Sequence, residues 1–204
     1  MDTFWLSTHT DLAVFHVKPL NDTAVNQAVV RTVGLDLQPP TVGSRVNGWG
    51  QRNSSSAISI NESGSLHYEI NGEGAATVGE VREYHPTGTD TVLRPFPCCR
   101  VNARFDGGMS GGPIFLDNGK LGGIICSNLP PYDNNDEHCS YVTALWPLLA
   151  MNINIDPTTG LLVEEQYLFY ELVKSGFVNV INLDKVLVTR QEETGLYNFA
   201  YVGN

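Results

Sequence analysis

The chain has 204 residues, of which 42% are hydrophobic and 17% charged, a balance typical of a globular protein rather than a disordered one. Its formal net charge of −10 argues against partners with dense negative charge, so we predict no nucleic-acid partner and no membrane partner. No run approaches the roughly 18 apolar residues that a membrane span needs.

Short apolar runs separated by glycine and proline predict an all-β protein of many short strands. The Ser/Asn-rich residues 51–62 predict a loop with some strand character, and residues 71–72 and 86–88 predict turns. The runs predicted as strands are 11–17, 65–70, 75–84, 91–96, 121–126 and 140–145.

The second half of the chain predicts a hairpin turn, a helix and a second hairpin. The turn is the sequence DNGK at 117–120. Apolar residues at helical spacing predict a helix over 161–174. Residues 186–188 and 197–202 predict a terminal hairpin.

The strongest local signal is GGMSGGP at positions 107–113, directly before an apolar strand. A serine that attacks a carbonyl must project from a tight turn, with backbone N–H groups aimed at the developing oxyanion. Glycines allow the backbone dihedrals that such a turn requires. We therefore predict Ser110 as a nucleophile and the amides of Gly108 and Ser110 as oxyanion donors. The alternative is a glycine-rich β-turn with an incidental serine.

This motif, with the Gly-Ile-Ile strand that follows its hairpin, resembles the nucleophile region of chymotrypsin/trypsin-like serine peptidases. Asp11, at the start of an apolar strand, resembles the aspartate that orients the catalytic histidine in that family. Asp11 and Ser110 lie 110 − 11 = 99 positions apart, against roughly 93 in the chymotrypsin template. The resemblance implies a serine endopeptidase with a polypeptide substrate.

The same resemblance implies a chymotrypsin-like double β-barrel whose first barrel is incomplete, followed by a C-terminal helix and hairpin. Residues 1–38 would be a remnant of the first barrel, carrying the strand with Asp11. Residues 39–150 would form the second barrel with the nucleophile turn, and residues 151–204 a C-terminal extension.

The chain departs from the family most clearly in its histidines. The template histidine precedes the aspartate by about 45 residues, whereas only ten residues precede Asp11. His9 lies too close to Asp11 to reach between that residue and Ser110. We therefore expect the chain to be inactive as it stands, through a false start at Met1 or because it is a fragment.

Four further residues are predicted to bind substrate through the resemblance. Arg104, six residues before Ser110, would line the primary specificity pocket and favour an acidic side chain. Cys126, Ser127 and Asn128 would offer backbone hydrogen bonds to an added peptide strand. Alternatively, Arg104 points to solvent, and residues 121–127 form an ordinary core strand.

No cofactor and no metal are predicted, since no Cys/His grouping has zinc-ligand spacing. Cys126 and Cys139 flank a loop that could bring them into a disulfide, and sequence leaves this pairing open. Residues 1–6 show no signal-peptide pattern, so we expect a protein that is intracellular, or secreted with its N-terminus missing.

Two other readings compete with the peptidase. The first is a non-catalytic peptide-binding or scaffolding relative that keeps the second barrel as a docking surface. The second is an unrelated β-sandwich in which the serine motif arises by chance.

Overall fold

The computed structural model describes residues 3–7, 9–17, 32–60, 64, 66–129 and 137–203. The prediction of an all-β fold is confirmed, since the described residues form fourteen strands and one short α-helix. The strands of the central sheet are β3 (Leu35–Asp36), β4 (Arg45–Ile60), β5 (Leu66–His85), β6 (Cys98–Val101), β7 (Pro113–Leu116), β8 (Leu121–Leu129), β9 (Cys139–Thr143) and β12 (Val180–Ile181).

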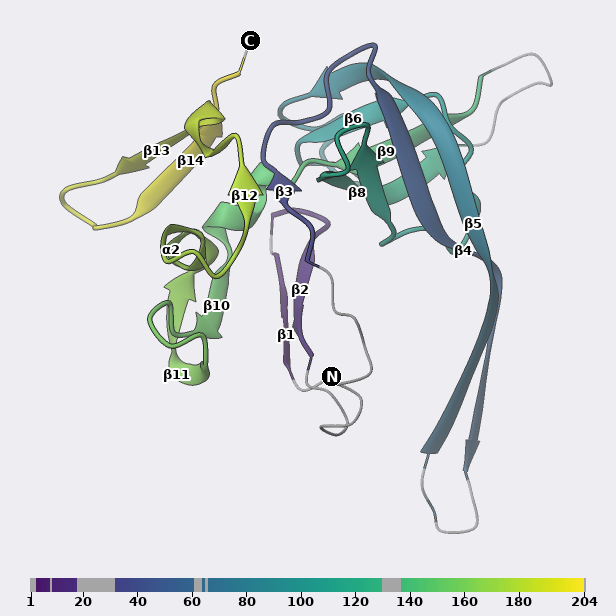
Figure 1. Cartoon of the computed structure of the whole chain (residues 1–204), viewed down its shortest axis with the longest axis horizontal. Helices are drawn as coiled ribbons and strands as arrows, with labels where there is room; N and C mark the ends of the chain where they lie inside the picture. The colour runs from purple at the N-terminus through teal and green to yellow at the C-terminus, as the bar shows by residue number, and fades with distance from the viewer. Residues whose placement is uncertain are drawn as a thin grey trace.

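Six of these strands close into an antiparallel barrel. They are hydrogen-bonded in the order β8-β7-β4-β5-β6-β9, and β9 pairs again with β8. Closure removes the open strand edges that would otherwise invite aggregation. The ring of strands is visible at the right of Figure 1. These six strands lie within residues 39–150, the range over which the sequence predicts a second barrel.

The barrel interior is filled by one fully buried aliphatic side chain from each strand. Successive strand residues point to opposite faces, so these six residues share the inner face. Phe105 and Met109 complete this core from the segment between β6 and β7. The six residues are Val46, Val81, Val101, Ile114, Ile125 and Val142.

A second core joins the N-terminal hairpin to the C-terminal part of the chain. The N-terminal hairpin consists of β1 (Thr3–Leu6) and β2 (Ala13–His16), and Trp5 and Leu12 point into this core. Within residues 3–17 the first lobe is thus a hairpin and not a closed barrel. The predicted residues 18–31 of this lobe lie outside the described residues.

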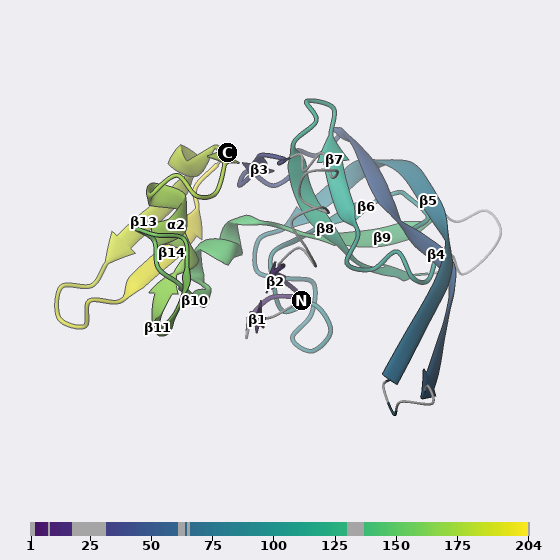
Figure 2. The same cartoon turned by 60° about the horizontal axis from the view of Figure 1, so that its bottom comes forward.

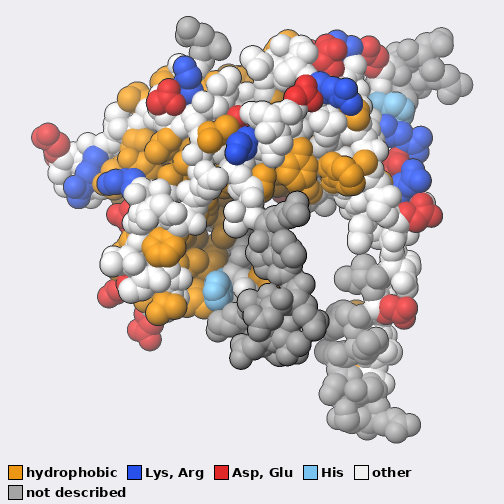
Figure 3. Space-filling view, in the orientation of Figure 1, with side chains coloured by type: hydrophobic (Ala, Val, Ile, Leu, Met, Phe, Trp, Pro, Cys, Tyr) orange, Lys and Arg blue, Asp and Glu red, His pale blue; other side chains and the backbone are white. Residues whose placement is uncertain are grey.

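The C-terminal elements lie beside the barrel in Figures 1 and 2 and include the predicted hairpin. Figure 3 shows hydrophobic side chains gathered across the middle of this face of the molecule, with charged side chains mostly around its margin. These elements are η1 (Trp146–Ala150), β10 (Asn152–Ile155), β11 (Leu162–Leu168), α2 (Phe169–Lys174), η2 (Leu183–Lys185), β13 (Val186–Arg190) and β14 (Tyr197–Tyr201).

The predicted helix over 161–174 is wrong for its first half. Residues 162–168 form β11, which pairs with β10, and the helix begins only at Phe169. Apolar residues spaced three to four apart can also fall on a strand, and here the partner strand supplies the backbone hydrogen bonds that decide between the two.

The predicted strand character of residues 51–60 is confirmed, but the loop predicted there and the turn at 71–72 are wrong. Residues 61–62 of the predicted loop lie outside the described residues. β4 continues to Ile60 and β5 begins at Leu66, so the two strands form one long hairpin that projects from the barrel (Figures 1 and 2). Asn71 stands opposite Ser55 within this ladder. A bulge between residues 52 and 55 carries Asn53 at a positive φ of 52°, which locally increases the strand twist.

The predicted turn at 117–120 is confirmed, and the disulfide between Cys126 and Cys139, which the sequence left open, is not formed. The turn at 117–120 connects β7 to β8, with Gly119 at a φ of 75°. All four cysteines, including Cys126 and Cys139, are free thiols. None of the described helices has both the length and the apolar character required to cross a membrane.

Candidate active site

Ser110 occupies the tip of a glycine-rich turn between β6 and β7. Gly108 and Gly111 on either side of it have φ values of 98° and 83°, which L side chains rarely adopt. Met109 is fully buried in the barrel core, whereas Ser110 is exposed. The buried methionine therefore anchors the turn and leaves the serine hydroxyl on the outer surface.

The turn packs tightly against the backbone of β4. A Cβ on Gly112 would overlap the carbonyl oxygen of Trp49, and a Cβ on Gly108 would lie 2.8 Å from the carbonyl oxygen of Gln51. Gly50 on β4 similarly leaves room for Met109. These glycines are required because two backbone segments approach closely here.

Hydrogen bonds tie the same turn to β8. The N–H of Gly111 donates to the carbonyl of Ile125 (2.8 Å), and the N–H of Ile125 donates to the carbonyl of Gly112 (2.9 Å). Among the described residues, the N–H groups of Gly108 and Ser110 donate to no other residue. Neither amide therefore has an acceptor within the described part of the chain.

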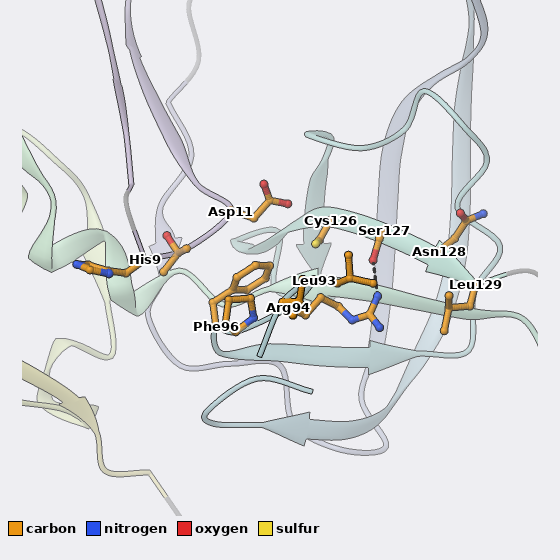
Figure 4. A pocket seen from close by; sticks show the side chains of 12 residues that line it. His9, Asp11, Leu93, Arg94, Phe96, Cys126, Ser127, Asn128 and Leu129 are labelled. Atoms are coloured by element: carbon orange, nitrogen blue, oxygen red, sulfur yellow. Dashed lines mark hydrogen bonds between the residues drawn. The ribbon is translucent and has the colours of Figure 1, made fainter. Parts of the chain in front are cut away.

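Asp11 reaches the neighbouring residue of β8 from the turn between β1 and β2. Burial and, after it, the hydrogen bond and charge of the Asp11 carboxylate together raise the pKa of the Cys126 thiol to about 12. Figure 4 shows Asp11 directed toward Cys126. Because Ile125 and Cys126 are consecutive, the structure anchors the Ser110 turn and Asp11 to adjacent points on one strand.

A pocket of about 710 Å³ opens beside Asp11 (Figure 4). Three of its residues are the predicted substrate-binding residues Cys126, Ser127 and Asn128. Its other walls are residues 9–10 of the N-terminal hairpin and residues 92–96 of the loop between β5 and β6.

β8 presents one free edge along this pocket. Its pairing with β7 ends at Ile124, whereas its pairing with β9 continues to Leu129. Over residues 126–129 the edge that faces away from β9 therefore has no partner strand in the described part of the chain. Such an edge can accept an extended peptide as an additional strand.

Arg104 does not join this pocket. It lines a separate hollow of about 530 Å³ together with Arg52, Asp106 and Gly108. Its guanidinium pairs with the Asp106 carboxylate, and its side chain is 66% exposed. The structure thus places Arg104 beside the nucleophile turn but apart from the free edge of β8, and its charge already has an anionic partner.

No described histidine side chain is hydrogen-bonded or ion-paired to Asp11 or Ser110. His9 borders the pocket but points away from Asp11 in Figure 4. His85 instead lies 3.2 Å from the Glu83 carboxylate. Within the part of the chain that the structure describes, no group of three His, Cys, Asp or Glu residues could hold a metal ion.

Arg94 is the pocket residue that sequence reasoning missed. Its side chain is only 11% exposed, and its Nη1 donates to Ser127 Oγ at 3.3 Å. The only signal in the sequence is the spacing of Asp90 and Arg94, four residues apart in a loop. That spacing does not show that the arginine reaches β8.

No protein-family model and no curated protein matches the chain. Among solved structures, the chain is similar to an inactive-form crystal structure of a serine-to-alanine mutant of Rv3671c from M. tuberculosis H37Rv. This similarity has 17% identity, a TM-score of 0.41, and coverage of 69% of this chain and 57% of that one.

A second similar structure is an inactive form of the Rv3671c protease. It has 17% identity, a TM-score of 0.35, and coverage of 58% of this chain and 51% of that one. The chain thus spans little more than half the length of both structures.

Proposed function

We propose that this chain carries the nucleophile and the orienting carboxylate of a trypsin-like serine endopeptidase, which cleaves peptide bonds through an acyl-enzyme on Ser110. The observation that carries the proposal is the convergence of the Ser110 turn and Asp11 on Ile125 and Cys126 of β8. A serine triad needs its nucleophile and its carboxylate held on one rigid support, with room between them for an imidazole.

Ser110 Oγ would attack the scissile carbonyl and lose its proton to a general base. The carbonyl oxygen becomes an oxyanion as the bond to Ser110 forms, and the amides of Gly108 and Ser110 would stabilise that charge. Their lack of acceptors within the described chain supports this role. The same base then protonates the leaving amine, and water hydrolyses the acyl-enzyme.

The polypeptide substrate would add to the free edge of β8 at residues 126–128. Main-chain hydrogen bonds then hold it in extended form, so that its scissile bond is presented to Ser110. The short path from Ile125, which is bonded to the nucleophile turn, to Cys126 supports this placement.

We propose that the chain is inactive without a base from elsewhere. No described histidine contacts Asp11 or Ser110, so the serine hydroxyl stays protonated near neutral pH. Loss of a triad member leaves only about 10³–10⁴-fold catalysis over water, which comes from the oxyanion donors and from binding. Asp11 would orient an imidazole, and no described histidine side chain occupies that position.

The second candidate is a non-catalytic peptide-binding relative. The observation that favours it is the same missing imidazole, because the free edge of β8 and its pocket are formed without it. In this case Ser110 is an ordinary exposed hydroxyl beside a peptide groove.

A serine-directed fluorophosphonate probe separates the two functions. It would be applied to the chain and to the chain extended by its in-frame upstream coding sequence. We expect labelling of the extended protein that disappears in Ser110→Ala and persists in Ser127→Ala, the matched serine of the pocket. A stop codon directly before Met1, or a folded extended protein that does not label, would leave the peptide-binding function.

A further inference from the structure

The pocket beside β8 contains one nearly buried cation, Arg94. It comes from the loop between β5 and β6 and lines the pocket together with Ser127, Asn128 and Leu129 (Figure 4). Its side chain is 11% exposed, and burying a charge costs free energy unless the charge is paired and hydrogen-bonded. Because Arg94 lines this pocket, its side chain borders the space that a peptide on the β8 edge would enter.

Three contacts fix the orientation of this guanidinium. Nε donates to Thr89 Oγ1 at 2.9 Å, and Nη1 donates to Ser127 Oγ at 3.3 Å. The guanidinium carbon also lies 4.0 Å from the centre of the Tyr141 ring, in a cation–π contact. A side chain held in this way loses little further entropy when it binds a ligand.

Among the described residues, the positive charge of Arg94 has one carboxylate partner, Asp90, which forms an ion pair with it but no hydrogen bond. The nearest carboxylate oxygen, Asp90 Oδ2, lies 3.6 Å from Arg94 Nη2, beyond hydrogen-bond distance. Oδ1 of Asp90 instead accepts the backbone N–H groups of residues 92, 93 and 94. Two of the five guanidinium N–H groups are hydrogen-bonded, and the other three have no hydrogen-bond acceptor among the described residues.

We propose that Arg94 selects a carboxylate side chain, Asp or Glu, in a peptide bound to the free edge of β8. Directly opposite residues on one face of a sheet have Cβ atoms about 4.5–5.5 Å apart. A peptide residue beside Ser127 on the same face therefore lies within reach of the guanidinium that already contacts Ser127 Oγ. The inference rests on the proposed function, and it moves acid selection from Arg104 to Arg94.

Arg94 could instead serve only to pin its own loop, through Thr89 and Tyr141. That role would not make binding depend on the charge of the peptide. The measurement that separates the two roles is therefore the difference in binding affinity between a peptide with Glu and the same peptide with Gln. The overall affinity does not separate them.

The test uses two sets of extended peptides whose side chains are uncharged at all positions but one. That position carries Glu in the first set and Gln in the second, and it is moved stepwise along the peptide. Binding to the intact chain is measured by fluorescence anisotropy. At one position we expect the Glu peptide to bind about tenfold more tightly than its Gln counterpart, with a preference that falls as salt is added. Arg94→Gln should abolish the preference, and Arg104→Gln, the matched control, should keep it.

Equal binding of Glu and Gln peptides at every position would overturn the inference and leave the proposed function standing. Binding of no peptide would overturn both. Should Arg94→Gln fail to fold, Asp90→Asn provides the second variant. Its amide oxygen can still accept the loop N–H groups, while the competing charge is removed. The Glu preference must then rise, and an unchanged or smaller preference refutes the role of Arg94.

Discussion

The close approach of the Ser110 turn to β4 makes Gly112→Ala a demanding test of the site geometry. The added Cβ would overlap the carbonyl oxygen of Trp49 and lie 2.8 Å from that of Met109. Ordinary contacts begin at 3.4 Å, so the second overlap alone requires a shift of 3.4 − 2.8 = 0.6 Å. Both neighbours are backbone atoms and cannot rotate away, so the turn itself must move.

Such overpacking costs about 1–3 kcal/mol. For a chain of this size each 1 kcal/mol corresponds to roughly 2–4 °C in Tm. Urea and thermal denaturation should therefore show that Gly112→Ala is clearly less stable than the parent chain. Gly107→Ala is the matched control, because a Cβ there meets nothing within 4 Å, and its free energy of unfolding should change by less than about 0.5 kcal/mol. Equal stability of the two variants would refute the packing of the turn against β4.

Three further outcomes are expected. Asp11→Asn should speed iodoacetamide alkylation of Cys126 at about pH 10, because losing the carboxylate lowers the pKa of that thiol, whereas Asp117→Asn in the distant β7–β8 turn should not. The free energy of unfolding should fall between about pH 9 and about 12, because burial raises the pKa of Cys99 from 9.0 to about 12 and the unfolded chain loses that thiol proton at lower pH than the folded chain. In urea titrations at a series of pH values, the free energy of unfolding of Cys99→Ala should fall less steeply with pH than that of the parent chain, and an equally steep fall would contradict this. Phe105→Ala, at a position 1% exposed in the barrel core, should lower the free energy of unfolding by about 3–5 kcal/mol in denaturant titrations, and a loss below about 1 kcal/mol would show that the barrel is not filled as described.

Features that depend on a few consecutive residues were predictable from the sequence. The Ser110 turn is one, because its glycines supply the positive φ values that only such residues adopt freely. The turn at 117–120 and the terminal hairpin of β13 and β14 follow from turn residues between alternating runs.

Predictions failed where two local conformations were equally compatible with the pattern. Residues 162–168 satisfy a helical spacing, yet pairing with β10 makes them a strand. Residues 51–60 are polar enough for a loop, yet the ladder with β5 continues through them. In both places a partner strand supplied hydrogen bonds that the local pattern does not encode.

The residues of the candidate site also show this difference between local sequence and tertiary contacts. The family resemblance implied Arg104 as the cation near the substrate, whereas the structure places Arg94 against Ser127, which is 33 positions away along the chain. A short stretch of the sequence does not indicate which loop packs against which strand.

The amino-acid sequence by itself determined the all-β character of the chain and the bend at Ser110, because these depend on local backbone sterics and on residue identity. Only the tertiary structure decided that β9 closes the barrel against β8, that Asp11 meets Cys126 and that Arg94 enters the pocket. These contacts join segments far apart in the chain, and they are selected by the joint packing of the two hydrophobic cores and not by any single segment.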